Sequence, residues 1–307
     1  MCYSAEVEED WRKFVRITGV DMSLKDFHDK YWKRKSGLPF RMPKMFDRWF
    51  DGIPGKEAAE IRRLIAEWNA DQIRQFEQQA FESRKRIADG ERALKTKVTK
   101  KAQEDVRIGT NKLKQARRKL DDLKRSESEP DDGRIFPGWY APVVMVEDGK
   151  RIVRPMRYQC RPEGKPEFYD TKYPGTYNAR RDNLEGFWKG QFGHTHGLTV
   201  VKKFYENVDR DGKNAVLEFT PNNGEDMIVA CLYSHWIGKD GEDLWSFAAI
   251  TDEPPAEVAA AGHDRCIIPI KPEHMDAWLN PDPSNLAALY AILDDRERPY
   301  YEHRLAA

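Results

Sequence analysis

The feature that most constrains this chain is a long stretch, from Glu57 to Ser128, that contains no proline and only two glycines. Proline breaks helices and glycine weakens them, so the stretch predicts long α-helix. Apolar residues recur every seven positions along it, which is typical of helices that pack along a seam. One set is Ile73, Ala80, Ile87 and Leu94, followed by Val106, Leu113 and Leu120, and the second set is Ala102, Gly109, Ala116 and Leu123.

The length of this stretch favours a hairpin of two antiparallel helices over one rod. The turn falls at Gly90 or within KTKVTKK (residues 95–101), and the seam alone fits an intramolecular hairpin and a dimer equally well. Residues 82–125 hold 16 Lys and Arg against 7 Asp and Glu. The whole chain has a formal net charge of zero, so the rest of the chain is acidic. The local surplus of positive charge makes this basic arm either a solvated helical surface or a binding surface for phosphates.

From Ile135 onward prolines and glycines are frequent and the predicted elements are short. Four runs rich in Val, Ile and aromatic residues predict strands, and two further runs predict short helices. The strands are GWYAPVVMV, NAVLEFTP, DMIVACLYSHWIG and LWSFAAIT, and the helices are PEHMDAWL and PSNLAALYAIL. Short helices are also expected in the first 54 residues. We predict an α+β fold: an antiparallel, β-rich, barrel-like core with flanking short helices and an inserted long helical hairpin.

The predicted organisation has three parts. Residues 1–54 form the N-terminal part of the catalytic domain, residues 55–130 form the basic helical insertion, and residues 131–307 form the main β-rich domain. No apolar run approaches the roughly 20 residues that span a bilayer, and no signal peptide is evident, so we expect a cytoplasmic, nucleoid-associated protein without membrane contact.

The sequence predicts neither a cofactor nor a metal site. It contains no GxGxxG and no P-loop lysine motif, and its four cysteines show no CxxC pair. His194 and His196 in GHTHG are spaced for a metal clip on a strand, but a turn with two polar histidines is the favoured interpretation.

Cys2 follows the initiator methionine directly. Removal of Met1 would leave a residue with both a thiol and a free α-amine, whose ordinary pKa values are about 8.5 and about 7.7–8.0. Such an aminothiol condenses with an aldehyde: the amine forms a Schiff base and the thiol closes a five-membered thiazolidine. Alternatively, the thiol attacks an acyl carbon. Either reaction needs groups that donate and accept protons, typically Glu or His.

Four separated segments resemble the SOS response-associated peptidase family of abasic-site-processing proteins. They are Met1-Cys2, Asn178-Ala179-Arg180 in GTYNARRDNLEG, Phe204-Tyr205-Glu206 in VKKFYENV, and His263-Asp264-Arg265 in GHDRCIIPIKPEHMDAWL. GWYAPVV and PMRY are weaker echoes. The resemblance covers the first residues and roughly 135–280, and it leaves out the basic arm, so the chain resembles a divergent member with a long helical insertion.

The resemblance implies covalent capture of an abasic site in single-stranded DNA or at a strand junction. Cys2 would form the thiazolidine with the ring-opened aldehyde, after self-removal of Met1. Glu206 would shuttle protons, His263 would act as a second acid or base, and Asn178 would orient the reacting centre. The resemblance also implies autoproteolytic peptidase activity and allows lyase activity.

The same resemblance assigns DNA contacts to arginines. Arg180 and Arg265 are the expected DNA-binding residues, because guanidinium groups bind phosphate in bidentate fashion. Trp139, Trp188 and Trp236 are candidates for base stacking, with core packing as the alternative for each.

The sequence departs from the family pattern in three places: Tyr3-Ser4 replaces Gly-Arg, Asn207 replaces Trp, and Cys266-Ile267 replaces Met-Pro. The basic arm is a candidate source of the missing phosphate contacts. Two alternative functions stay open: a thiol peptidase or amidohydrolase with an N-terminal cysteine nucleophile, and a non-catalytic DNA-binding scaffold.

Overall fold

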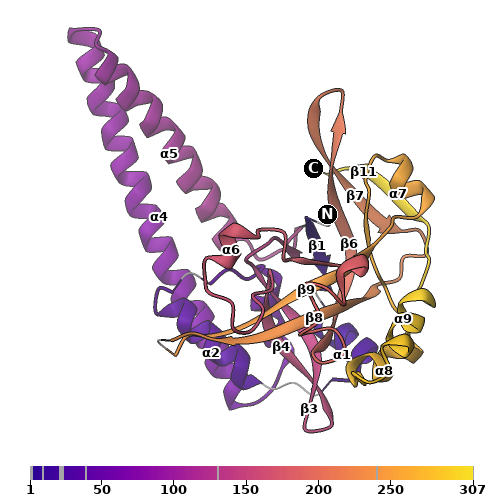
Figure 1. Cartoon of the computed structure of the whole chain (residues 1–307). Helices are drawn as coiled ribbons and strands as arrows, with labels where there is room; N and C mark the ends of the chain where they lie inside the picture. Colours follow the sequence, from indigo (N-terminus) through magenta and orange to yellow (C-terminus); the bar gives the residue numbers. More distant parts are fainter. Residues whose placement is uncertain are drawn as a thin grey trace.

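Five strands close into a ring at the centre of the molecule (Figure 1). The computed structural model describes residues 3–8, 10–20, 24–38, 40–129, 131–239 and 241–306. Around the ring, each strand pairs with the next and the last pairs with the first. In that order the strands are β3 (Tyr140–Glu147), β4 (Lys150–Tyr158), β9 (Asp243–Asp252), β8 (Met227–Ile237) and β6 (His196–Arg210). All pairs are antiparallel except β4 with β9, so the ring confirms the predicted barrel-like core.

A glycine allows the ring to close. Val144 of β3 pairs with Leu198 of β6, directly after Gly197. A Cβ atom at Gly197 would lie 2.7 Å from Val143 Cγ1 and 3.2 Å from Val144 O. Glycine is therefore needed for the two backbones to approach this closely.

Short strands extend the sheet beyond the ring. The second half of β6 leaves the barrel and pairs with β1 on one side and β7 on the other. β2 pairs with β1, β11 pairs with β7, and β5 and β10 pair with the end of β9. The bounds are β1 (Ser4–Val7), β2 (Arg134–Ile135), β5 (Asn178–Arg180), β7 (Lys213–Pro221), β10 (Cys266–Ile267) and β11 (Tyr301–Leu305).

Short helices flank the sheet, as predicted. α1 begins after Asp10, whose Oδ1 accepts the amides of Arg12 and Lys13, and it ends at Gly19 with φ of 64°. The others are α2 (Leu24–Lys35), α3 (Met45–Trp49), α6 (Tyr169–Lys172), α7 (Ala256–Ala260), α8 (Met275–Leu279) and α9 (Leu286–Asp294), and α1 spans Trp11–Thr18. No helix in the described ranges is both long enough and apolar enough to cross a membrane.

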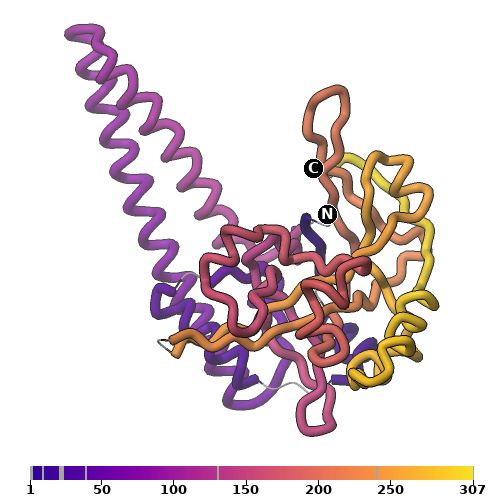
Figure 2. The backbone as a smooth tube through the Cα atoms, viewed as in Figure 1, coloured from indigo at the N-terminus to yellow at the C-terminus, as the bar shows by residue number. Residues whose placement is uncertain are grey.

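The predicted hairpin is an arm that projects from the body (Figures 1 and 2). It consists of α4 (Lys56–Thr96) and α5 (Lys100–Lys124), joined at residues 97–99. The turn therefore lies in KTKVTKK, and the alternative turn at Gly90 is wrong because Gly90 lies inside α4. The seam is used within the chain, where small side chains are buried between the helices: Ala80, Ser83 and Gly90 on α4, and Ala102, Gly109 and Ala116 on α5.

Replacing Gly90 by leucine is expected to splay the arm. A Cβ at this position would lie 2.9 Å from Val106 Cγ2 and 3.2 Å from Ala102 O, so a larger side chain overpacks the seam and costs about 1–3 kcal/mol. Circular dichroism during thermal unfolding measures the loss of helix. Ala88→Leu, at an exposed position of the same helix, is the control. Equal unfolding curves for the two variants would contradict close packing at Gly90.

Two buried carboxylates meet beside α1. Lys13 Nζ lies 2.9 Å from Glu8 Oε2 and 2.7 Å from Asp226 Oδ2. Burial raises the pKa of Asp226 to about 7, and the hydrogen bond with Glu8 adds to the increase. Burial opposes ionisation of Glu8 as well, but hydrogen bonds from Asp226, the Asp10 amide and Lys13 lower its pKa to about 2. Asp226 therefore carries the proton that Glu8 accepts.

This pair predicts that stability falls between about pH 4.5 and pH 7. Folded Asp226 keeps a proton that the unfolded chain has already lost near pH 3.8, so its contribution declines by up to about 1.4 kcal/mol per pH unit until pH 7 is passed. The depressed pKa of Glu8 matters only below about pH 4.5. Asp226→Asn should remove this part of the slope in urea unfolding at a series of pH values. Parallel pH profiles for the variant and the wild type would refute the shared proton.

A buried carboxylate–imidazole pair as the candidate active site

Glu206 lies on the part of β6 that has left the barrel. Its side chain has no exposed surface, and its neighbours Phe204 and Tyr205 are also fully buried. β1 and β7 pair with this part of β6 on either side, with Glu206 opposite Leu217. Burying a carboxylate is costly unless it is paired or hydrogen-bonded, so this position is one where function is expected.

The imidazole of His263 provides the partner. His263 lies in the loop between α7 and β10, and its Nε2 is 3.1 Å from Glu206 Oε2. Burial lowers the pKa of His263, although its backbone contact with Arg265 acts in the opposite direction. The structure thus brings together two of the residues predicted from separate motifs.

The other ring nitrogen of His263, Nδ1, contacts two backbone groups of Arg265. Nδ1 of His263 is 2.9 Å from the carbonyl oxygen of Arg265 and 3.2 Å from the amide nitrogen of the same residue. A protonated Nδ1 donates to the carbonyl, and a bare Nδ1 accepts from the amide. The Glu206–His263 pair can therefore hold one proton or two with Nδ1 satisfied in each state, which suits a group that gives and takes protons.

The described chain starts next to this pair. Cys2 lies outside the described residues. Ser4, the first residue of β1, is paired with Tyr205, the residue before Glu206.

A network that the sequence analysis missed fixes the start of β1. The hydroxyl of Tyr205 donates to Asp131 Oδ1, and its oxygen lies 3.2 Å from Glu6 Oε2. The guanidinium of Arg134 lies 3.6 Å from the centre of the Tyr205 ring, and its Nε donates to Ser4 Oγ at 3.1 Å. Burial raises the pKa of Tyr205, which stays neutral. The Phe-Tyr-Glu segment includes Tyr205, but the residues that Tyr205 contacts lie far away in the sequence, so the segment alone could not reveal them.

Asn178 and Arg180 stand on β5, which pairs with β9 next to the position where β10 pairs with it. Asn178 is buried, whereas Arg180 is exposed and its Nη2 lies 2.5 Å from Asp182 Oδ2. This hydrogen bond raises the pKa of Arg180, and Asp264 adds to the effect. Arg180 and the His263 loop therefore share one face.

Arg265 belongs to the same face. Its positive charge helps its surroundings hold the pKa of Asp182 below the usual value, after the larger effect of Arg180. Its Nε is 3.9 Å from Asp264 Oδ2. The two predicted DNA-binding arginines thus lie near the Glu206–His263 pair, each beside a carboxylate.

Of the three tryptophans proposed for base stacking, two are excluded. Trp188 is buried, and Trp236 is buried with its indole Nε1 donating to the Lys165 carbonyl at 2.6 Å. Trp139 is only half-buried. Its ring lies 5.5 Å from Phe136, which in turn lies 5.9 Å from Tyr3. Tyr3, directly before β1, extends this row of aromatic rings.

His196, the second histidine of GHTHG, lies in the core. His196 is buried between Phe192 and Trp278, its Nε2 accepts the Gly193 amide at 2.8 Å, and burial lowers its pKa to about 3. Across the described ranges, no group of three His, Cys, Asp or Glu side chains is placed to hold a metal ion.

The three described cysteines are poor nucleophiles. Cys160, Cys231 and Cys266 are free and buried. Burial raises the pKa of Cys160 to about 12 and raises those of the other two as well. Cys266 and Ile267, one of the departures from the expected family pattern, are core residues of β10.

The structure thus combines a closed β-barrel with a buried carboxylate–imidazole contact on a strand that leaves it. The family model described as SOS response associated peptidase (SRAP) matches residues 96–304. The chain belongs to this family, which associates it with the response to DNA damage. The match extends beyond the segments that carry the resemblance and includes α5 of the arm.

Similar solved structures come from bacteria, and no curated protein matches the chain. A protein from Bordetella bronchiseptica is 17% identical with a TM-score of 0.47, over 59% of this chain and 90% of that one. A protein from Bacteroides thetaiotaomicron is 15% identical with a TM-score of 0.48, over 57% and 78%. A phage-related protein from Bordetella bronchiseptica is 18% identical with a TM-score of 0.44, over 57% and 81%.

Proposed function

We propose that the protein captures abasic sites in single-stranded DNA as a covalent thiazolidine at Cys2. The observation that carries the proposal is the buried Glu206–His263 contact of 3.1 Å. Glu206 directly follows Tyr205, which pairs with Ser4 at the start of β1. Family membership supports the connection to DNA damage. The raised pKa values of the buried thiols leave Cys2 as the candidate nucleophile.

The proposed reaction needs proton transfer at each step. Opening the sugar ring breaks the C1′–O4′ bond, moves a proton from the C1′ hydroxyl and places one on O4′. The α-amine of Cys2 then adds to the aldehyde, and loss of water gives the Schiff base. Addition of the thiol to the C=N bond closes the thiazolidine, so two bonds form and one water leaves. Glu206 and His263 serve as acid and base for these transfers.

Asn178, Arg180 and Arg265 have positioning roles in this proposal. Asn178 orients the reacting sugar, and the two arginines hold flanking phosphates after exchanging their carboxylate neighbours for phosphate oxygens. We also propose that the protein removes its own Met1, and that lyase activity at the Schiff base is a side reaction.

The test is incubation of purified protein with an abasic single-stranded oligonucleotide, followed by a denaturing gel and mass spectrometry of the protein N-terminus. A heat-stable shifted band and a missing Met1 are the expected results. Thiol-dependent cleavage of a peptide library without any such band would favour the peptidase alternative. Retention of DNA in a native gel without either activity would favour the scaffold.

A further inference from the structure

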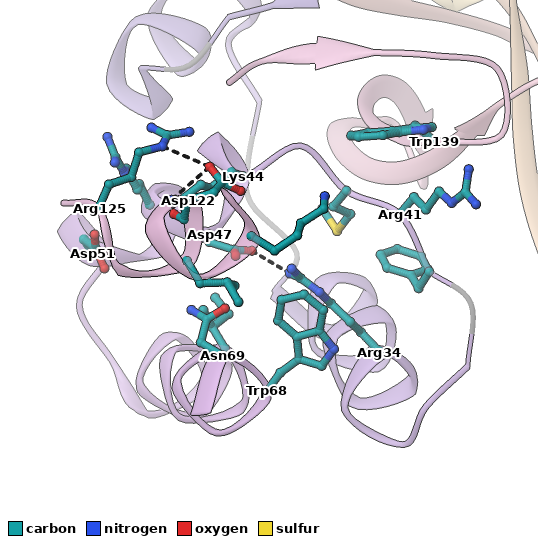
Figure 3. A pocket seen from close by; sticks show the side chains of 16 residues that line it. Arg34, Arg41, Lys44, Asp47, Asp51, Trp68, Asn69, Asp122, Arg125 and Trp139 are labelled. Atoms are coloured by element: carbon teal, nitrogen blue, oxygen red, sulfur yellow. Dashed lines mark hydrogen bonds and ion pairs between the residues drawn. The ribbon is translucent and has the colours of Figure 1, made fainter. Parts of the chain in front are cut away.

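A basic cavity lies at the foot of the arm, where the arm joins the body, outside the candidate active site. A cavity of about 680 Å³ opens between the N-terminal helices, the base of α4 and α5, and Trp139 (Figure 3). Six cationic side chains line this foot cavity, against the three acids Asp47, Asp51 and Asp122. The cations are Arg34, Arg41, Lys44, Arg48, Lys119 and Arg125.

Part of this positive charge is not neutralised. Arg34 Nη1 lies 2.8 Å from Asp47 Oδ1, and Lys44 and Arg125 both pair with Asp122. By contrast, the side chains of Arg41 and Lys119 form no ion pair within the described part of the chain. Asp51 is the remaining acid, and it is exposed.

Arg48, which also lines the foot cavity, has one nitrogen without an acceptor in the described ranges. Its Nη1 donates to Ser128 Oγ, but its Nη2 is buried and has no hydrogen-bond acceptor among the described residues. A buried donor of this kind is costly unless something binds to it. The lining thus has the character of a site for a phosphate group.

A row of aromatic rings connects the foot cavity with the start of β1. In Figure 3, Trp139 and Arg41 lie together on one side of the cavity, and Trp68 lies under Arg34, whose guanidinium is 3.7 Å from its ring. From Trp139 the row of rings continues through Phe136 to Tyr3, directly before β1. A single strand stacked on these rings would run from the candidate active site to the foot cavity.

We propose that the foot cavity binds flanking nucleotides of the same DNA strand, with successive phosphates on Arg41, Arg48 and Lys119 and a base on Trp139. The inference rests on the proposed function, because that function supplies the single-stranded DNA. Its chemistry is independent of Cys2, because every residue that it uses lies outside the Glu206–His263 site.

The test is the salt dependence of binding to an undamaged single-stranded oligonucleotide, measured by fluorescence anisotropy. Each phosphate contact on a single strand contributes about 0.7 to the slope of log K against log salt. Arg41→Ala combined with Lys119→Ala should therefore lower that slope by about 1.4 and weaken binding roughly tenfold at low salt. Lys25→Ala with Lys150→Ala, a matched pair of exposed lysines elsewhere, should leave the slope unchanged.

The outcomes separate this inference from the covalent reaction. Trp139→Ala should weaken binding further, and Trp139→Phe should restore most of it, because a phenyl ring still stacks. An unchanged slope in the Arg41/Lys119 variant overturns the foot cavity as a DNA site, even if abasic DNA is captured. A lowered slope without any capture by the wild type supports the foot cavity and removes the thiazolidine proposal.

Discussion

Cys2→Ser is expected to abolish the heat-stable crosslink to abasic DNA completely while preserving a Schiff base that borohydride traps. Serine keeps the α-amine, so the first bond to the aldehyde still forms. Its hydroxyl is a much weaker nucleophile than a thiolate, so the ring does not close into a stable product. A denaturing gel with and without borohydride measures both species.

The matched control for this experiment keeps the thiol and blocks the amine. Inserting a leucine between Met1 and Cys2 ties the cysteine nitrogen into an amide, so neither a Schiff base nor a crosslink should appear. A heat-stable crosslink from the inserted variant would show that the thiol reacts alone and would rule out the thiazolidine.

The second large effect is expected at Glu206. Glu206→Gln keeps the shape of the side chain but removes its proton chemistry, so the single-turnover rate of capture should fall by about 10²–10⁴. His263→Ala should lower the rate as well, and the double variant should be no slower than the worse single variant, because the two residues act as one unit. Rapid quenching on an abasic oligonucleotide gives these rates.

Glu218→Gln is the control for the Glu206 variant. Glu218 is also a buried carboxylate, on β7, but its ion-pair partners are Lys203 at 3.2 Å and Arg304 at 2.9 Å. Its replacement should change stability without changing the rate of capture by folded protein. Equal losses of rate in both variants would mean that Glu206 has only a structural role.

The sequence predicts the parts of the fold that repeat or alternate. The arm follows from the absence of proline and from the seven-residue spacing, although the spacing did not distinguish a turn at Gly90 from one at residues 97–99. Gly90 is a seam residue because the helices approach closely there, and only the partner helix reveals this. The predicted strand runs and both C-terminal helices lie where expected, and the α+β barrel is confirmed.

Other elements have no local signal. β1 is a strand because β6 and β2 pair with it on both sides, not because of its own four residues. The second half of β6 contains many charged residues, since part of it lies beyond the barrel. The contact between Glu206 and His263 joins segments far apart in the chain, so a motif predicted each residue but not their distance. Burial of Trp188 and Trp236 likewise depends on packing that composition does not show.

The backbone and the side chain of Arg265 have different roles, because it is the backbone that contacts the imidazole of His263. Both groups that face Nδ1 belong to the backbone of Arg265, so every residue except proline would keep them. The side chain, meanwhile, projects toward the face shared with Arg180. A substitution at this position would therefore change the proposed phosphate contact without changing the two backbone groups that face the imidazole. The same division makes position 265 a place to engineer affinity while leaving reactivity intact.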